Sequence, residues 1–372
     1  MSATYKKWLN DKLVKLQAIA CYTAGASPET VAKQLGITTK QVVKLSFNEN
    51  LFLPRVKQVK LIKELAEEID LRLYPEDEDA KLREKLSAYI GAPKENIVIG
   101  NGSDELIDRI VRLFVEKGET ALSFTPTFAI PPLCVKRQEG EYVTVPLLSN
   151  LQLDVKGLLS KFSDKTRLLY ICSPNNPTST QYKMEDVEIL AKAFPGIIIL
   201  DEAYGEFADY SFVPRISEFQ NMIILRTFSK AFGLAALRLG YAVANSELAK
   251  TLTEKAPLPY PVSAFTLRMG SKMLDNVGLM MESVKQVKKE RGKLMKALNE
   301  IEGVQAFDSQ ANFLLVNTQR PADEVNEELL EKGIMLKKWG KIMQYNNCFR
   351  VTVGLPEMNA KLIEALKQIL EE

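Results

Sequence analysis

The most reactive group that the sequence offers is the side-chain amine of Lys230. This lysine follows the apolar run at residues 222–227 and lies among aromatic and small residues in FSKAF, residues 228–232. Partial burial and neighbouring cations lower the pKa of such an amine, and a lowered pKa suits a lysine that forms a Schiff base. A surface lysine with a buried aliphatic stem explains the same position. Lys230 alone therefore does not identify a function.

Three other groups of polar residues also follow apolar runs. Asp201 and Tyr204 lie in DEAY, which places a carboxylate at a strand end and a phenol three residues later. The loop SPNNPT, residues 173–178, has two prolines that make it rigid and two asparagines that present side-chain amides. NGSDE, residues 101–105, opens a helical segment whose free N–H groups suit a phosphate. A helix cap or a plain turn is an alternative explanation of each group.

Composition excludes several classes of function. The absence of histidine removes Ser-His-Asp and Cys-His catalytic pairs and every imidazole-bound metal. The four cysteines form no CxxC pair, so we expect no disulfide framework and no metal site. The 49 basic and 47 acidic residues produce no global field for nucleic acid or an anionic membrane, and the N-terminus lacks an apolar core for a signal peptide or a membrane span. We expect a cytoplasmic protein that binds neither nucleic acid nor membranes.

Residues 59–262 are predicted to form the larger domain. Short apolar runs alternate there with segments of helical period, which is typical of a mainly parallel sheet covered by helices on both faces. The seven runs are residues 97–100, 120–124, 142–145, 167–172, 196–200, 222–227 and 239–244. Ligands of such sheets bind beyond the carboxyl ends of the strands, which is where the polar groups lie.

The character of the chain changes after Pro257, Pro259 and Pro261. Long charged amphipathic helices are expected around residues 263–300 and 357–371, with two strands at 312–316 and 349–353 between them. These elements predict a smaller α+β domain over residues 263–372. We expect the first 55 residues to pack with it, and assign residues 1–58 to an N-terminal arm and part of the small domain.

Taken together, the motifs resemble those of one enzyme family. RTFSKAFGLAALRLGY, residues 226–241, follows PNNPT and DEAY in the order typical of the fold type I, class II pyridoxal-phosphate aminotransferases, and among them of the histidinol-phosphate aminotransferases. The resemblance extends from about Val42 to Gly354. It implies the α/β fold of type I pyridoxal-phosphate (PLP) transferases, PLP as cofactor, and amino transfer between L-histidinol phosphate and 2-oxoglutarate in histidine biosynthesis.

The resemblance also implies roles for single residues. Lys230 carries the cofactor as a Schiff base and moves a proton between substrate and cofactor. Asp201 pairs with the pyridine nitrogen and keeps it protonated, so that the ring accepts electrons. Tyr204 and Asn176 form hydrogen bonds with the phenolic oxygen of the cofactor, and Phe128 stacks on its ring. The residues implied to bind the cofactor phosphate are Gly102, Ser103, Asp104, Thr227, Ser229 and Arg238.

Four residues are implied to contact substrate. Arg350, in FRVTVG, matches an arginine that clamps a carboxylate or a phosphate, and Lys337 stands where many relatives have a second anion-binding arginine. Asn176 contacts substrate as well as cofactor. Tyr74 matches a tyrosine that reaches the site of the neighbouring subunit, which implies a homodimer.

Three departures from the family pattern bear on the substrate. LFLP, residues 51–54, replaces the usual small residue and proline after Asn50, Ser179 replaces the usual glycine, and Lys337 keeps a positive charge without the bidentate geometry of arginine. A transaminase for aromatic or acidic amino acids, or a threonine-phosphate decarboxylase, therefore stays an alternative on the same fold.

A DNA-binding regulator is the alternative from another class of protein. Residues 27–45 have a pattern that is also found in helix-turn-helix motifs, and some regulators combine an aminotransferase fold with a basic DNA-binding domain. The N-terminal stretch is too short and too neutral for such a domain, and the charge balance offers no support. We favour the enzyme.

Overall fold

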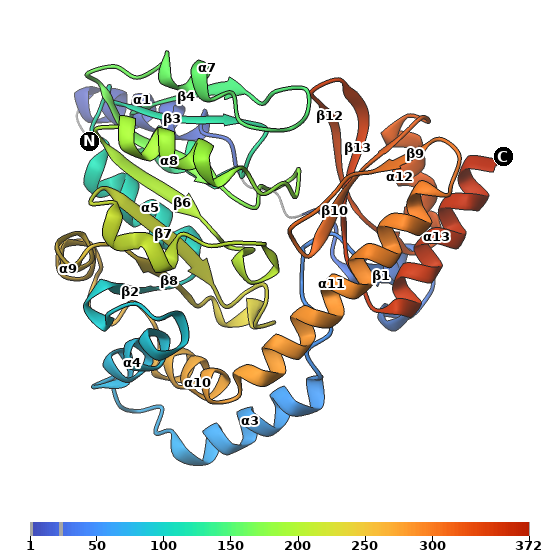
Figure 1. Cartoon of the computed structure of the whole chain (residues 1–372), viewed down its shortest axis with the longest axis horizontal. Coiled ribbons are helices and arrows are strands. Elements are labelled where there is room, and N and C mark those ends of the chain that lie inside the picture. Colours follow the sequence, from blue (N-terminus) through green and yellow to red (C-terminus); the bar gives the residue numbers. More distant parts are fainter. Residues whose placement is uncertain (1–2, 22–24, 372) are drawn as a thin grey trace.

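The computed structural model describes residues 3–21 and 25–371, which form a larger and a smaller part (Figure 1). The larger part contains a seven-stranded sheet and the smaller part a four-stranded sheet, with a separate two-stranded sheet. The predicted α/β class and the mainly parallel seven-stranded sheet are confirmed. No helix in these two described ranges is long and apolar enough to cross a membrane.

The large sheet has the strand order β2-β8-β7-β6-β5-β3-β4. Its strands are β2 (Ile97–Gly100), β3 (Thr120–Thr125), β4 (Glu141–Pro146), β5 (Thr166–Cys172), β6 (Ile197–Asp201), β7 (Met222–Thr227) and β8 (Gly240–Val243). Neighbouring strands are parallel except where β8 pairs with β2 and with β7. All seven apolar runs predicted from the sequence are strands. The inner strands are largely apolar because helices cover both faces of the sheet, whereas β4 lies at its edge and is partly exposed.

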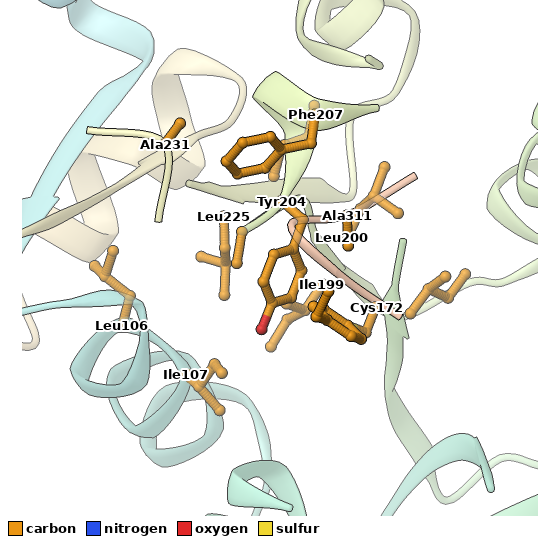
Figure 2. Packing of buried hydrophobic residues seen from close by; sticks show 14 of the residues in the cluster. Leu106, Ile107, Cys172, Ile199, Leu200, Tyr204, Phe207, Leu225, Ala231 and Ala311 are labelled. Atoms are coloured by element: carbon orange, nitrogen blue, oxygen red, sulfur yellow. The ribbon is translucent and has the colours of Figure 1, made fainter. Parts of the chain in front are cut away.

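Helices pack against this sheet and against one another. They are α3 (Arg55–Glu68), α4 (Glu78–Ile90), α5 (Ser103–Phe114), α6 (Ile130–Arg137), α7 (Val155–Leu159), α8 (Met184–Ala193), α9 (Ser246–Glu254) and α10 (Ala264–Asp275). Helix α5 buries Leu106, Ile107, Ile110 and Val111, whose spacing forms one apolar face. Figure 2 shows Leu106 and Ile107 within the same core cluster as Leu200 of β6 and Leu225 of β7. This packing holds the N-terminus of α5 near the strand ends.

The smaller part is an antiparallel sheet with helices beside it. Its strands β9 (Val304–Ala306), β10 (Phe313–Thr318), β12 (Lys337–Ile342) and β13 (Tyr345–Thr352) have the order β12-β13-β10-β9. The helices are α11 (Val277–Asn299), α12 (Ala322–Glu331) and α13 (Pro356–Glu371). Helix α11 runs from the larger to the smaller part (Figure 1). Five short 3₁₀ helices complete the fold, at Thr39–Gln41, Lys94–Asn96, Gly205–Phe207, Val213–Glu218 and Ala235–Leu237.

The N-terminal 55 residues divide between the two parts, although we expected all of them to pack with the small domain. Strand β1 (Val43–Lys44), which follows α2 (Pro28–Leu35), pairs in parallel with β11 (Ile334–Met335) of the smaller part. Helix α1 (Ala3–Gln17) instead contacts the larger part, because Lys12 Nζ lies 3.5 Å from Glu139 Oε1 in the turn between α6 and β4. Helix α10, which we assigned to the small domain, contacts α3 and α4 of the larger part.

A close backbone contact fixes the start of α5 against the sheet. Gly240 opens β8, and a Cβ at this position would lie 2.5 Å from the backbone nitrogen of Ser103 and 2.6 Å from the carbonyl carbon of Gly102. Atoms do not approach this closely without a shift, and neither neighbour is a flexible side chain. A glycine at 240 therefore permits the turn at residues 102–103 to lie directly on the strand end.

Replacement of Gly240 by alanine should disrupt this contact. We expect Gly240→Ala to lower the free energy of unfolding by about 1–3 kcal/mol, since the backbone of the turn has to move. Gly292→Ala is the matched control, because Gly292 lies in α11 with no atom within 4 Å of a built Cβ. The control should raise stability by about 0.5–1 kcal/mol. Equilibrium urea unfolding measures both, and equal stabilities for the two variants would contradict the contact.

Candidate active site

Lys230 lies just beyond the end of β7, in the loop that leads to β8. Its Nζ donates a hydrogen bond to the backbone oxygen of Phe47 at 3.1 Å and lies 5.8 Å from the centre of the Tyr204 ring. Burial lowers the pKa of Lys230 to about 8, and the nearby guanidinium of Arg350 acts in the same direction. The amine is thus partly neutral near neutral pH, as a nucleophile or a base has to be.

Asp201 ends β6 and is 2% exposed. Its Oδ2 accepts a hydrogen bond from the Tyr170 hydroxyl at 2.7 Å, and its Oδ1 accepts one from the backbone N–H of Ala203 at 3.0 Å. Both donors are neutral groups. Burial raises the pKa of Asp201 to about 6, and the two hydrogen bonds oppose this shift. The site thus holds a buried carboxylate that a protonated ring nitrogen would stabilise.

The hydroxyl of Tyr204 lies where the two parts of the chain meet. It accepts a hydrogen bond of 3.0 Å from Nδ2 of Asn48, which precedes the larger part in the chain. The Tyr204 ring packs edge-on against Phe313 of β10, with ring centres 5.1 Å apart. Burial raises the pKa of Tyr204, so the phenol keeps its proton at neutral pH.

Arg350 of β13 connects the predicted substrate residues. Its Nη1 donates to Asn176 Oδ1 at 2.8 Å, and its Nη2 donates to the backbone oxygen of Ser46. Lys337 of β12 is its direct cross-strand partner in the antiparallel register. Side chains of such partners project from the same face of a sheet, so two cations lie together there. The structure thus brings Arg350 and Asn176 into contact and places Lys337 across from Arg350.

The residues expected to bind a phosphate converge at the start of α5. Arg238 donates from Nη2 to Asp104 Oδ2 at 3.0 Å and from Nη1 to Ser229 Oγ at 3.2 Å. Gly102 caps the helix with a φ of 84°, and a Cβ there would lie 2.8 Å from Arg238 Nη2. Helix N–H groups, a guanidinium and a hydroxyl thus surround one point.

Thr227 and Phe128 are placed less directly. The Thr227 hydroxyl accepts from the backbone N–H of Ser229 at 3.1 Å and donates to the Leu239 oxygen at 3.3 Å, so it shapes the lysine loop from within. Phe128 is partly buried against the core, and the turn before it is held by Asn175, whose Oδ1 accepts from Thr127 Oγ1 at 2.8 Å. The backbone that carries Phe128 is therefore held in place by this hydrogen bond.

Ser179 joins this loop to the smaller part. It has a φ of 58°, in the left-handed region that favours glycine, and its side chain is fully buried. Its backbone oxygen accepts from the N–H of Gln310 at 2.9 Å, and Gln310 Oε1 accepts from the N–H of Gln181 at 3.1 Å. These two hydrogen bonds link the larger and smaller parts beside the SPNNPT loop.

The structure places Tyr74 on the surface of a single chain. Its side chain is 75% exposed, and its ring stacks on Tyr260 with centres 4.9 Å apart. Tyr260 belongs to the proline-rich segment that precedes α10.

Sequence patterns did not identify several residues that organise the site. Tyr170, the partner of Asp201, is one aromatic residue in an apolar strand, and no pattern distinguishes Asn48 from other asparagines of the sequence. Arg226 forms buried ion pairs of 2.9 Å with both Glu202 and Glu206, which flank the turn at Tyr204. The alternation of the strand would have placed Tyr170 on the same face as Cys172 and the strand end. Ion pairs between residues that are 20 or more positions apart, such as those of Arg226, leave no comparable pattern in the sequence.

The arrangement fits the cofactor that the resemblance implies. PLP presents a ring nitrogen, a phenolic oxygen, an aldehyde and a phosphate, and the chain offers a group for each. Asp201 suits the nitrogen, Tyr204 and Asn176 suit the oxygen, and Lys230 suits the aldehyde. The turn at residues 102–104 with Arg238 suits the phosphate.

The family model, the curated relatives and the solved structures that resemble this chain are all aminotransferases or related enzymes of the same fold. The model of class I and II aminotransferases matches residues 40–366. The chain is 36% identical over 332 residues to a histidinol-phosphate aminotransferase of Caldanaerobacter subterraneus subsp. tengcongensis, which covers 88% of this chain and 93% of that one. It is 36% identical over 329 residues to histidinol-phosphate aminotransferase 1 of Archaeoglobus fulgidus, with 88% and 99% covered. The crystal structure of histidinol-phosphate aminotransferase from Sinorhizobium meliloti in complex with PLP aligns with a TM-score of 0.84 and 26% identity, covering 95% and 98%.

The raised pKa of Asp201 predicts a pH-dependent stability of the cofactor-free protein. The folded state holds this proton up to about pH 6, whereas the ordinary pKa of an aspartate carboxyl is 3.8, so ionisation of Asp201 lowers stability as pH rises through this interval. Asp201→Asn should therefore raise the free energy of unfolding at pH 8 by about 1–3 kcal/mol. The gain should shrink at pH 5. Urea unfolding at both pH values tests this.

The exposed carboxylate of Asp209 provides the control. Asp209→Asn should change stability by less than about 0.5 kcal/mol at either pH, because it lies outside the core. A gain for Asp201→Asn that is the same at pH 5 and pH 8 would show that burial of the Asp201 charge does not limit stability.

Proposed function

The chain belongs to the class I and II aminotransferases, and on this premise we propose that it transfers the amino group of L-histidinol phosphate to 2-oxoglutarate, with PLP bound at Lys230. The observation that carries the proposal is the convergence of an amine of lowered pKa, Lys230, with the buried carboxylate of Asp201 at the ends of β7 and β6. The buried thiols of Cys134, Cys172 and Cys348 favour a reducing cytoplasm as its location.

PLP supplies an aldehyde that combines with amines and a ring that accepts electrons. The carboxylate of Asp201 holds the ring nitrogen protonated, because a proton there neutralises a charge that burial disfavours. Tyr204 and Asn176 donate to the phenolic oxygen, and Phe128 lies against the ring. The N–H groups of Ser103 and Asp104, with Ser229 and Arg238, hold the phosphate. Gly102 and Thr227 shape these two turns.

Lys230 holds the proton that the reaction moves. With a pKa of about 8, its Nζ takes up or releases a proton near neutral pH without a large cost in either direction. The hydrogen bond from Nζ to the Phe47 oxygen keeps the amine beside the Tyr204 ring. Lys230 therefore acts as the general base and acid of the transfer once it no longer holds the cofactor.

Arg350 and Lys337 bind the anionic end of the substrate. The guanidinium fork of Arg350 suits the phosphate of histidinol phosphate as well as a carboxylate of 2-oxoglutarate. Lys337 adds a second positive charge from the neighbouring strand. Because Arg350 already donates to Asn176, an anion that binds Arg350 lies next to the amide that faces the cofactor.

A homodimer completes the site in this proposal. Large apolar or aromatic side chains are exposed in two segments that meet where Tyr74 stacks on Tyr260: Leu71, Leu73, Tyr74, Leu258 and Tyr260. Clusters of this kind are usually covered by a partner. A second copy would cover this surface and receive Tyr74 next to its own Lys230.

Substrate identity is tested by the visible spectrum of the purified protein with PLP. L-histidinol phosphate at low concentration should convert the cofactor to its amine form, which removes the yellow band. Phenylalanine, aspartate and threonine phosphate serve as alternative donors. Conversion by one of these but not by histidinol phosphate would keep the family and reject the substrate. Release of carbon dioxide from threonine phosphate, with the cofactor left as the aldehyde, would indicate a decarboxylase.

The role of Lys230 is tested in the same samples. Borohydride should attach the cofactor to Lys230 in the native protein and give no adduct in Lys230→Ala. A reducible adduct at another lysine of the variant would reject the assignment.

Shared sites predict complementation between inactive variants. Tyr74→Ala and Lys230→Ala should each be nearly inactive. After unfolding and refolding as an equal mixture, about half of the dimers are mixed, and each has one site with both residues, so about a quarter of the native activity should return. Activity is measured against the unmixed variants treated in the same way. No recovery in a mixture that is dimeric by light scattering would place Tyr74 outside the neighbouring site.

A further inference from the structure

Asn48 is a buried polar residue at the junction of three segments. It is 1% exposed, and it follows β1 in the chain. Its side chain contacts Tyr204 of the larger part and Thr352 at the end of β13 in the smaller part. Its backbone oxygen accepts a hydrogen bond of 2.9 Å from Nδ2 of Asn312. Main chain and side chain are thus held from both parts of the protein.

Thr352 determines which end of the Asn48 amide faces Tyr204. The Thr352 hydroxyl accepts from the backbone N–H of Asn48 at 2.9 Å, and it lies 3.3 Å from Asn48 Oδ1, to which it donates its single proton. The amide oxygen is therefore directed toward Thr352 and the amide nitrogen toward Tyr204. Asn48 Nδ2 donates to Tyr204 Oη at 3.0 Å.

This direction determines what the Tyr204 hydroxyl can do. An oxygen that accepts a hydrogen bond from Asn48 does not use its own proton in that bond, so the proton is available for a different acceptor. The pKa of Tyr204 is raised by burial, which keeps that proton on the phenol. Tyr204 is thereby prepared as a donor rather than an acceptor.

The backbone at Asn48 restricts which residues can take its place. Its φ is 56°, in the left-handed region that most side chains avoid and that asparagine tolerates. Glycine would satisfy the backbone without supplying the amide. Aspartate would tolerate the backbone but would accept the Tyr204 proton instead of donating.

We propose that Asn48 is a positioning residue, oriented by Thr352, that directs the Tyr204 hydroxyl to donate its hydrogen bond to the phenolic oxygen of PLP. The inference rests on the proposed function. A donor stabilises negative charge on that oxygen, so the proton that the oxygen shares with the neighbouring nitrogen leaves at lower pH. Residues 48 and 352 lie outside the larger part, so contacts from the smaller part act on the bound cofactor through Tyr204.

The test is the pH at which the visible band of the PLP-loaded protein changes, with the dissociation constant for PLP as a second readout. Asn48→Gly should raise this pH midpoint by about 0.5–1 pH unit and weaken PLP binding about twofold to tenfold. Thr352→Val should act in the same direction with a smaller shift. Asn48→Asp should give the largest upward shift, because it withdraws the Tyr204 proton.

A double-mutant cycle separates orientation from general disturbance. In a Tyr204→Phe background, Asn48→Gly should leave the midpoint unchanged, since the hydroxyl on which it acts is absent. Asn359→Ala is the matched control, because its buried amide bonds only to Gly354 among the described residues. It should lower stability without moving the midpoint.

Several results would overturn the inference. They are an unchanged midpoint in Asn48→Gly, or a shift of equal size with and without the Tyr204 hydroxyl. Failure of the native protein to form a band with PLP at Lys230 would instead reject the proposed function. Asn48→Gly keeps the positive φ without strain, and folding is checked by its unfolding transition, with Thr352→Val giving the same comparison in a variant that leaves residue 48 intact.

Discussion

The site depends on a buried carboxylate, that of Asp201, whose hydrogen-bond donors are both neutral groups. Among the described residues, the hydrogen-bond donors to Asp201 are a phenol and a backbone N–H, and burial leaves its pKa well above the ordinary value. A buried charge in this state is costly, so the protein must hold the donors rigidly. The parallel register that pairs Cys172 with Asp201 does this, since it carries Tyr170 to the carboxylate from the adjacent strand. In the proposed complex, the protonated ring nitrogen of the cofactor would supply the positive charge that Asp201 lacks.

The turn after Asp201 is held from two sides. Beneath it, Arg226 joins Glu202 and Glu206 in buried ion pairs, and loss of one partner of such a pair leaves an uncompensated charge. Gly205 leaves room for this guanidinium, since a Cβ there would lie 2.6 Å from Arg226 Cζ. Above it, Asn48 and Phe313 contact Tyr204. The same turn therefore fixes both Asp201 and Tyr204, so a change in its contacts should move the two side chains together.

The features that could be predicted are those that leave a local pattern in the sequence. The strands of the large sheet are continuous apolar runs because both faces are buried, so their positions and the polar residues at their ends followed from sequence. The roles of Lys230 and Arg350 came from motif order within a family. Tyr170 could not be distinguished from a core tyrosine, and the contact between Asn48 and Tyr204 joins residues 156 positions apart. The ion pair between Lys12 of α1 and Glu139 likewise joins residues that are 127 positions apart.

The link between Ser179 and Gln310 has a consequence for divergence of the family. The bond from the Gln310 N–H to the Ser179 oxygen uses main-chain atoms only. Such a bond survives substitution of either side chain, as long as residue 179 tolerates a positive φ. This part of the placement of the two lobes therefore does not depend on which side chains stand at positions 179 and 310. Under the proposed function, Lys337 could change to suit another substrate while this link between the two halves stays in place.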